Sequence, residues 1–167
     1  MNDPHENTPV IKRIGGYLHK VAPVLDSAGK VISYVTTPIM VELRPRDIMQ
    51  IVVGASILAV PVAFTEETWK LGAELPTLNV LLLSFISISF IAAFVYFNFY
   101  RFMLKDHKRE YIKRVLAIYL VSLVIVGGLL TLIMRCPWST EPLVALKRIL
   151  IVAFPASMSA AISDGIK

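Results

Sequence analysis

Two adjacent glutamates, Glu66 and Glu67, lie in the stretch AFTEETWK at the end of a segment that carries no charge from Ile48 onward. Carboxylates at the end of an apolar helix can bind a cation or relay a proton. Pro61 lies about one turn earlier and frees a backbone carbonyl, and carbonyls near a carboxylate resemble the ion sites of broken transporter helices. The alternative is an interfacial carboxylate pair, with Trp69 as anchor and Lys70 four residues after Glu66.

Hydroxyl side chains recur in two other apolar segments. Ser84 and Ser87 lie in the segment that runs from about Leu75 to Tyr100, and Ser157 follows Pro155 in the motif FPAS. Small residues at four-residue spacing allow membrane helices to pack closely, which is one reading of these positions. The other reading is a hydroxyl-lined path for an ion or a solute.

The remaining polar residues give weaker indications of function. We expect Asp47 among the lipid headgroups, and Asp164 either as an exposed tail carboxylate or, with Ser163, as part of an inner gate. The lone Cys136 cannot form an internal disulfide. The sequence contains no catalytic triad arrangement, zinc-protease motif, phosphate-binding glycine loop or haem spacing. We therefore expect no enzyme activity, no catalytic residue, no metal and no cofactor.

The elements that must position these residues are apolar. The chain of 167 residues is 56% hydrophobic and 17% charged, with a mean hydropathy of +0.66, whereas globular chains are about 25% charged. Four apolar runs predict spanning helices, which need about 20 residues each. The fold class expected is all-α: a polytopic membrane protein with a four-transmembrane-helix bundle over residues 47–167. The predicted spans are 47–66, 76–100, 114–134 and 144–163.

The basic residues predict an orientation. Four spans place thirteen Lys and Arg residues on the side of both termini and four, Lys70, Arg135, Lys147 and Arg148, on the other. The positive-inside rule then places both termini in the cytoplasm of a cell membrane. Basic charge that faces anionic lipid explains the net charge of +5 without nucleic acid. The expected interface anchors are Trp69, Trp138, Tyr96, Tyr100 and Arg101.

Residues 1–46 form a separate cytoplasmic or interfacial segment in this reading. Apolar residues from Val10 to Val35 recur at helical spacing, which predicts short amphipathic helices on the membrane surface. A short strand around Val31–Val35 is the competing interpretation. The first nine residues, MNDPHENTP, are expected to be disordered.

Three motifs carry a family resemblance: PVAFTEETW at the end of the first span, LPTLN at the start of the second and FPAS in the fourth. Together they resemble a small prokaryotic family of integral membrane proteins of unknown function, over roughly residues 46–165. The element TEExW contributes most of the resemblance. It implies a four-helix membrane unit, and it brings no activity, cofactor or functional residue with it.

Two functions remain open. The leading hypothesis is an oligomeric channel or transporter subunit for a small cation or solute, in which one glutamate per subunit lines the outer mouth. It predicts that Glu66→Gln or Glu67→Gln alters cation flux. The alternative is a membrane scaffold or regulatory protein that does not transport and binds lipid or a protein partner through its N-terminal segment and basic loop.

Overall fold

A computed structural model describes residues 10–27, 30–39, 42–101, 104 and 107–166. The chain forms two compact units, residues 1–42 and 43–167. The predicted disordered start and two of the basic residues counted above, Lys105 and Lys167, lie outside the described residues.

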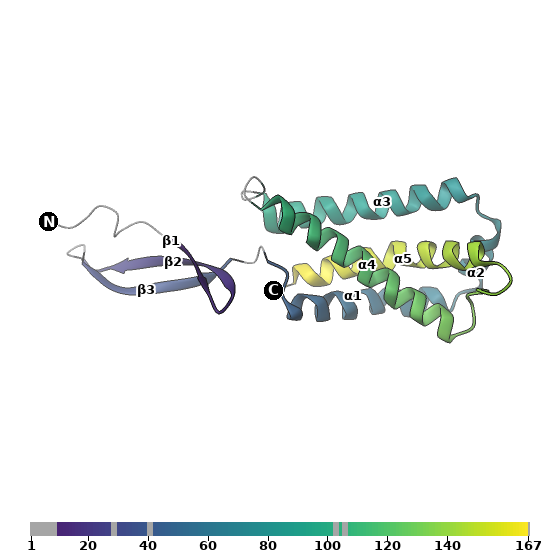
Figure 1. Ribbon diagram of the computed structural model, residues 1–167, viewed down its shortest axis with the longest axis horizontal. Helices are drawn as coiled ribbons and strands as arrows, with labels where there is room; N and C mark the ends of the chain where they lie inside the picture. Colours follow the sequence, from purple (N-terminus) through teal and green to yellow (C-terminus); the bar gives the residue numbers. More distant parts are fainter. Residues whose placement is uncertain (1–9, 28–29, 40–41, 102–103, 105–106, 167) are drawn as a thin grey trace. The chain divides into compact units, whose positions relative to one another are not determined.

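The first unit is a three-stranded antiparallel sheet of order β1-β2-β3 (Figure 1). Strand β1 covers Val10–Ile14, β2 covers Tyr17–Leu25 and β3 covers Val31–Pro38. Glu42 supports the sheet, because its carboxylate pairs with Arg13 and accepts a hydrogen bond of 3.2 Å from the backbone N–H of Leu18.

The predicted amphipathic helices in this segment are therefore wrong, whereas the competing strand at Val31–Val35 corresponds to β3. Gly15 and Gly16 decide the outcome, since they have φ angles of +59° and +87°. A two-residue hairpin of type I′ requires positive φ at both positions, which glycine adopts without strain. Ile14 consequently pairs with Tyr17, and the β-branched residues of the segment extend as strands.

The second unit is helical and has four helices long and apolar enough to cross a membrane. Helix α1 covers Pro45–Ala63, α3 covers Thr77–Val95, α4 covers Lys108–Leu132 and α5 covers Pro142–Gly165. A π-helical turn, η1 (Tyr96–Tyr100), continues α3, so that this second span covers 24 residues. The fold is thus mostly helical with four membrane-length helices, as the apolar runs predict.

The first span ends three residues earlier than expected, because α1 ends at Ala63 and a separate short helix, α2 (Glu66–Glu74), follows. Thr65 lies at the break: its hydroxyl donates to the Val62 carbonyl at 2.8 Å and meets the Thr68 hydroxyl at 2.6 Å. Its extended backbone, with ψ at 134°, starts the new helix in a different direction. The two glutamates therefore belong to α2 and not to the end of the first span.

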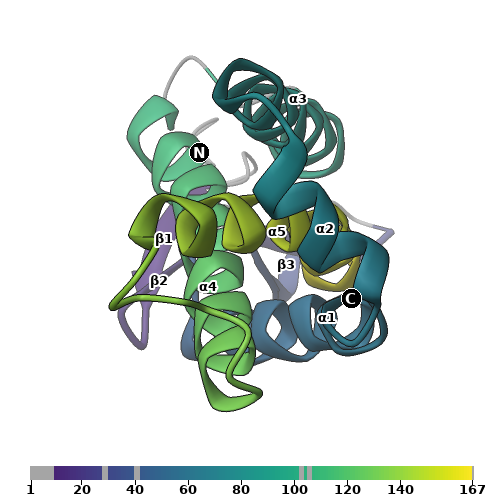
Figure 2. The ribbon, with the colours of Figure 1, turned by 90° about the vertical axis from the view of Figure 1, so that its right-hand side faces the viewer.

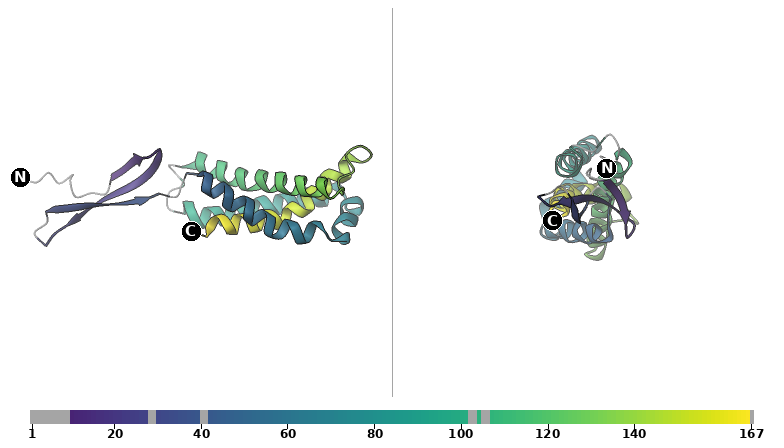
Figure 3. Two further views of the ribbon diagram at one scale, coloured as in Figure 1. Left: turned by 90° about the horizontal axis from the view of Figure 1, so that it is seen from below. Right: turned by 90° about the vertical axis from the view of Figure 1, so that its left-hand side faces the viewer.

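Helix α5 is the centre of the bundle. It packs against α1, α2, α3 and α4, and the end-on view shows it among the other three long helices (Figure 2). Seen from below, the long helices run side by side along most of their length (Figure 3). Their shared core consists of small and branched apolar side chains: Ala59, Ala63, Val126, Leu130, Ile149, Val152, Ala153 and Ala156.

Large apolar side chains cover the outer surface of the bundle. On α3, for example, Leu78, Leu81 and Phe85 are all more than half exposed. A soluble protein rarely exposes so continuous an apolar surface, whereas the acyl chains of a bilayer are its natural environment.

Candidate functional site

The most conspicuous polar feature inside the helical unit is Arg114 of α4, whose side chain is 0% exposed. Its guanidinium donates from Nε to Oδ2 of Asp164 at 2.9 Å, and from Nη2 to Oδ2 of Asp47 at 2.7 Å. A further contact joins Nη2 to Oδ1 of Asp164 at 3.3 Å. One cation thus holds carboxylates from two other helices, and we call these three residues the Arg114 cluster.

Each member lies near the end of its helix, and α1, α4 and α5 bring those ends together. Asp47 is in the first turn of α1, where a carboxylate stabilises free backbone N–H groups and accepts a hydrogen bond of 3.1 Å from the Arg44 N–H. Arg114 is in the second turn of α4, and Asp164 is in the last turn of α5. The cluster therefore ties the start of two helices to the end of a third.

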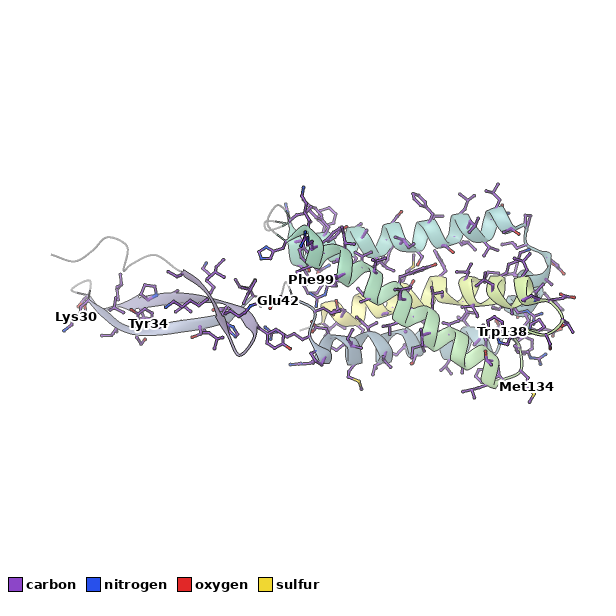
Figure 4. All side chains as sticks on the ribbon, viewed as in Figure 1. Lys30, Tyr34, Glu42, Phe99, Met134 and Trp138 are labelled. Carbon is purple, nitrogen blue, oxygen red and sulfur yellow. The ribbon has the colours of Figure 1, made fainter. Side chains whose placement is uncertain are left out.

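The π-helical turn η1 adds an aromatic wall to the cluster. The Phe99 ring lies under the Arg114 guanidinium, with the ring centroid 4.1 Å from Cζ, which is a cation–π arrangement. Tyr100 is fully buried and meets Tyr111 of α4 edge to face, at a centroid distance of 5.4 Å. Figure 4 labels Phe99 where η1 approaches α4. Single π turns inside helices are frequent at functional sites.

Burial makes this cluster electrostatically demanding. The Asp47 and Asp164 side chains are 4% and 0% exposed, so neither carboxylate is solvated by bulk water. With all three groups ionised, their formal charges sum to −1. Taking ions out of water costs several kcal/mol each, and the geometry recovers this only through short hydrogen bonds of the kind seen here. Ionisable groups held inside membrane helices are expensive and are commonly functional.

The predicted serine positions are partly brought together. Ser87 of α3 and Ser157 of α5 are both buried, and their hydroxyl oxygens are 2.6 Å apart. Ser84 instead donates to the Val80 carbonyl of its own helix at 3.1 Å. Ser157 also donates to the Phe154 carbonyl, one turn earlier in α5, which also contains Pro155. The pair connects two helices through hydroxyl groups that are satisfied by each other and by backbone.

The structure places Glu66 and Glu67 elsewhere, exposed on the first turn of α2. Glu66 forms a salt bridge of 3.1 Å with Lys70, and both side chains are well exposed. Pro61 is also exposed, inside α1. These three residues do not join the buried serines, and the pairing of Glu66 with Lys70 is the contact that the four-residue spacing predicts.

The expected interface anchors differ among themselves. Trp69 is half-buried and donates to the Ala63 carbonyl at 2.8 Å, whereas Trp138 is exposed and donates to Thr131 Oγ1 at 3.0 Å. Arg101 is exposed and Tyr96 is partly buried. Tyr100 differs from the other four, because its side chain is fully buried and packs against Tyr111 of α4.

Sequence reasoning missed the Arg114 cluster. The sequence predicts Asp164 as an exposed carboxylate or gate residue, Asp47 among the headgroups and Arg114 as part of the basic loop. All three are buried. The sequence does contain a signal: each of three spans has one charged residue near the same end, and these residues are two acids and one base. The contacts between them follow only once the arrangement of the helices is known.

One comparison with known families is informative at this point. Residues 31–164 match the model of a family described as "Putative integral membrane protein (DUF2391)". The chain belongs to this family. The match covers all four spans and the whole Arg114 cluster, and it begins at the first residue of β3, earlier than the predicted resemblance at about residue 46. No curated protein and no solved structure matches this DUF2391 chain. It is accordingly a multi-pass integral membrane protein with four spans.

Proposed function

We propose that this DUF2391 protein is a non-enzymatic transport protein, and that the Arg114 cluster is the site at which it holds a small cation, a proton in the simplest case. The observation that carries the proposal is one buried guanidinium shared between two buried carboxylates on three membrane-length helices. Within the described part of the chain, Asp47, Arg114 and Asp164 are the charged residues of the spans whose side chains are buried.

The cluster has the chemistry that such a site needs. If Arg114 stays with one carboxylate, a proton or a small cation can neutralise the other, so that the guanidinium and the cation compete for the same oxygen atoms. This competition couples cation binding to the packing of α4 against α1 and α5. Phe99 retains the guanidinium from its other side. Phe99 lies on the π turn η1, and π turns of this kind are frequent at functional sites.

The two remaining parts of the proposal concern assembly and orientation. Four helices packed around a central α5 leave little room for a path within one chain, so we infer that copies associate, as the small-residue faces favour. The excess of basic residues on the side of both termini supports an orientation in which the cluster end of the bundle faces the cytoplasm.

Flux through liposomes tests the site. The purified full chain is reconstituted with a pH-sensitive dye inside, and proton and sodium uptake are measured under an imposed potential. Asp164→Asn removes the charge at nearly the same shape and should abolish uptake, whereas Asp164→Glu should retain part of it. Glu66→Gln and Glu67→Gln, which alter exposed carboxylates, serve as matched controls and should retain the native rate.

Size-exclusion chromatography confirms that each variant is folded before its flux is compared. Native uptake in folded Asp164→Asn and Asp47→Asn would remove the cluster from the mechanism. If only Glu66→Gln or Glu67→Gln loses uptake, the cation site lies on α2 and not at the Arg114 cluster. A native protein that moves neither ion would overturn transport.

A scaffold without transport is the second candidate, and strand β3 favours it. This strand is at the edge of its sheet, and Ile32, Tyr34 and Val35 are 65%, 59% and 51% exposed. An exposed apolar edge strand readily pairs with another strand, and a second copy of β3 can do so symmetrically. If the protein is a scaffold, the native protein should show no ion flux. Tyr34→Lys should then lower the oligomeric state measured by light scattering.

A further inference from the structure

Three cations gather at the end of the helical unit opposite the Arg114 cluster. Arg135 follows α4, while Lys147 and Arg148 lie in the second turn of α5. Figure 4 marks this end by Met134 and Trp138, with Phe99 at the other end. The proposed transport mechanism uses none of these three residues.

Packing and hydrogen bonds fix the position of the Arg148 side chain. Its stem crosses α2 at Gly72, where a β-carbon would lie 2.3 Å from Arg148 Cγ, so that no other residue type leaves the stem in place. Its Nε donates to the Trp69 carbonyl at 3.1 Å and its Nη1 to the Arg135 carbonyl at 2.7 Å. Two neutral carbonyls therefore orient this half-buried guanidinium, and neither of them supplies a negative charge.

Arg135 adds a second guanidinium against the same tryptophan. Its Cζ lies 3.6 Å from the centroid of the Trp69 ring, a close cation–π contact that fixes the plane of the group. The indole N–H of Trp69 in turn donates to the Ala63 carbonyl, which fixes the ring. Lys147 donates to the Leu75 carbonyl at 2.9 Å. Trp69 thus carries one guanidinium on its ring and another at its backbone oxygen.

The charges around these groups are unbalanced locally. Among the described residues, no carboxylate lies within 4.0 Å of Arg135, Lys147 or Arg148. The carboxylates at this end are exposed on other turns, and Glu66 is engaged with Lys70. A guanidinium offers five N–H donors in a planar fork that matches the oxygen atoms of a phosphate. The carbonyls occupy only two of the donors of Arg148.

We propose that Arg135 and Arg148 bind a phosphate group beside Trp69. A phosphate supplies the negative charge that the carbonyls cannot, and it accepts charge-assisted hydrogen bonds from both guanidinium edges. Lys147 contributes long-range attraction. Because Trp69 and Trp138 belong to the boundary of the spans, the phosphate comes either from an anionic lipid headgroup or from solution.

Fluorescence of Trp69 reports occupancy directly. Trp138→Phe leaves Trp69 as the single tryptophan of the chain. The probes are inorganic phosphate added to protein in detergent, and reconstitution into phosphatidylcholine vesicles with or without phosphatidylglycerol. Inorganic phosphate, the phosphatidylglycerol content of the vesicles, or both are expected to shift the Trp69 emission in a saturable way, relative to protein without phosphate or in phosphatidylcholine alone. Arg135→Gln, made in the same background, should weaken the response about tenfold, the usual effect of losing one hydrogen bond to a charged group.

The matched control is Lys70→Gln, which removes another cation at the same end, one that is already paired with Glu66. It should leave the response unchanged. A response to phosphatidylglycerol alone assigns the site to lipid, and a response to inorganic phosphate alone assigns it to a soluble anion. No response to either probe, or equal responses in Arg135→Gln and Lys70→Gln, would overturn the proposal.

Discussion

Arg114 brings a positive charge into the buried interior of the helical bundle, and two carboxylates make this possible. The free energy lost when one partner is removed is much larger than the net stability that the intact ion pair contributes. Removing one partner of a buried ion pair leaves a charge that neither water nor protein compensates, which costs about 3–5 kcal/mol, although the intact pair contributes little net stability. The stability of the bundle at this end therefore depends on completeness of the cluster more than on its strength.

A substitution at Arg114 tests this asymmetry. Arg114→Gln leaves Asp47 and Asp164 buried together, and we expect the free energy of unfolding in detergent to fall by about 3–5 kcal/mol. Lys113→Gln is the control on the neighbouring position, because the exposed pair with Glu110 contributes about 0.5 kcal/mol or less. Equal losses in the two variants would show that the cluster has no special energetic role.

The neutral version of the cluster separates charge from packing. Combining Asp47→Asn, Arg114→Gln and Asp164→Asn removes every charge while nearly preserving the shapes. This triple variant should be more stable than Arg114→Gln alone, since no uncompensated ion remains. If it is less stable, the polar side chains act through hydrogen bonds and not through charge.

Helices α1 and α5 approach one another more closely than ordinary side chains permit. A β-carbon on Gly54 would lie 2.4 Å from Ser163 Cβ and 2.9 Å from the Ala160 Cα. Contacts with backbone atoms cannot be relieved by a change of rotamer. Close approach of this kind is how membrane helices gain packing energy when no hydrophobic driving force acts between them.

Gly54→Val should accordingly separate α1 from α5 and lower the melting temperature markedly, because a side chain and a backbone atom occupy the required space. Gly128→Val is the matched control: Gly128 lies in α4, where a β-carbon meets nothing within 4 Å. Thermal unfolding of the two proteins in the same detergent gives the comparison. Similar melting temperatures would contradict the close approach.

The sequence predicts elements well where one physical signal dominates. Uninterrupted apolar length identifies all four spans, and the structure places their ends within a few residues of the predictions except near Thr65 and Lys108. The break at Thr65 has no Gly or Pro to mark it. The spacing of the apolar residues predicts helices at the N-terminus, whereas the two glycines between apolar runs are a strong signal for the hairpin that forms there.

The candidate site was less predictable, for a geometric reason. Arg114 is 67 residues from Asp47 and 50 residues from Asp164 in the sequence, and no local pattern links the three. The Ser87–Ser157 pair shows the same limit: both hydroxyls were identified as candidates, but their contact depends on how α3 packs on α5. Composition predicts which helices exist, and their relative rotation decides which polar residues meet.

At the scale of the whole molecule, the single Cys136 reports which side of the membrane the loop after α4 faces. Burial raises the pKa of its thiol, with opposing effects from Thr131 and Arg148. A raised pKa leaves less thiolate at neutral pH, and the thiolate is the reactive form. Labelling should therefore be slow near neutral pH and should accelerate as the pH rises above the usual thiol range.

With both termini in the cytoplasm, a membrane-impermeant maleimide should label Cys136 in intact cells at raised pH. The control moves the cysteine to the other end: Cys136→Ser with Lys108→Cys, an exposed position at the start of α4, should react only after the cells are opened. The reverse pattern would invert the proposed orientation and with it the side of the membrane on which the Arg114 cluster lies.

The chain order of the Arg114 cluster has a consequence for synthesis. Asp47 and Arg114 leave the ribosome first, and Asp164, in the last turn of the last helix, arrives only when all four spans have been made. Until then Arg114 lacks the carboxylate that accepts two of its hydrogen bonds. The cluster can close only when α5 is present, so a chain interrupted before α5 carries an incompletely compensated charge within its helices.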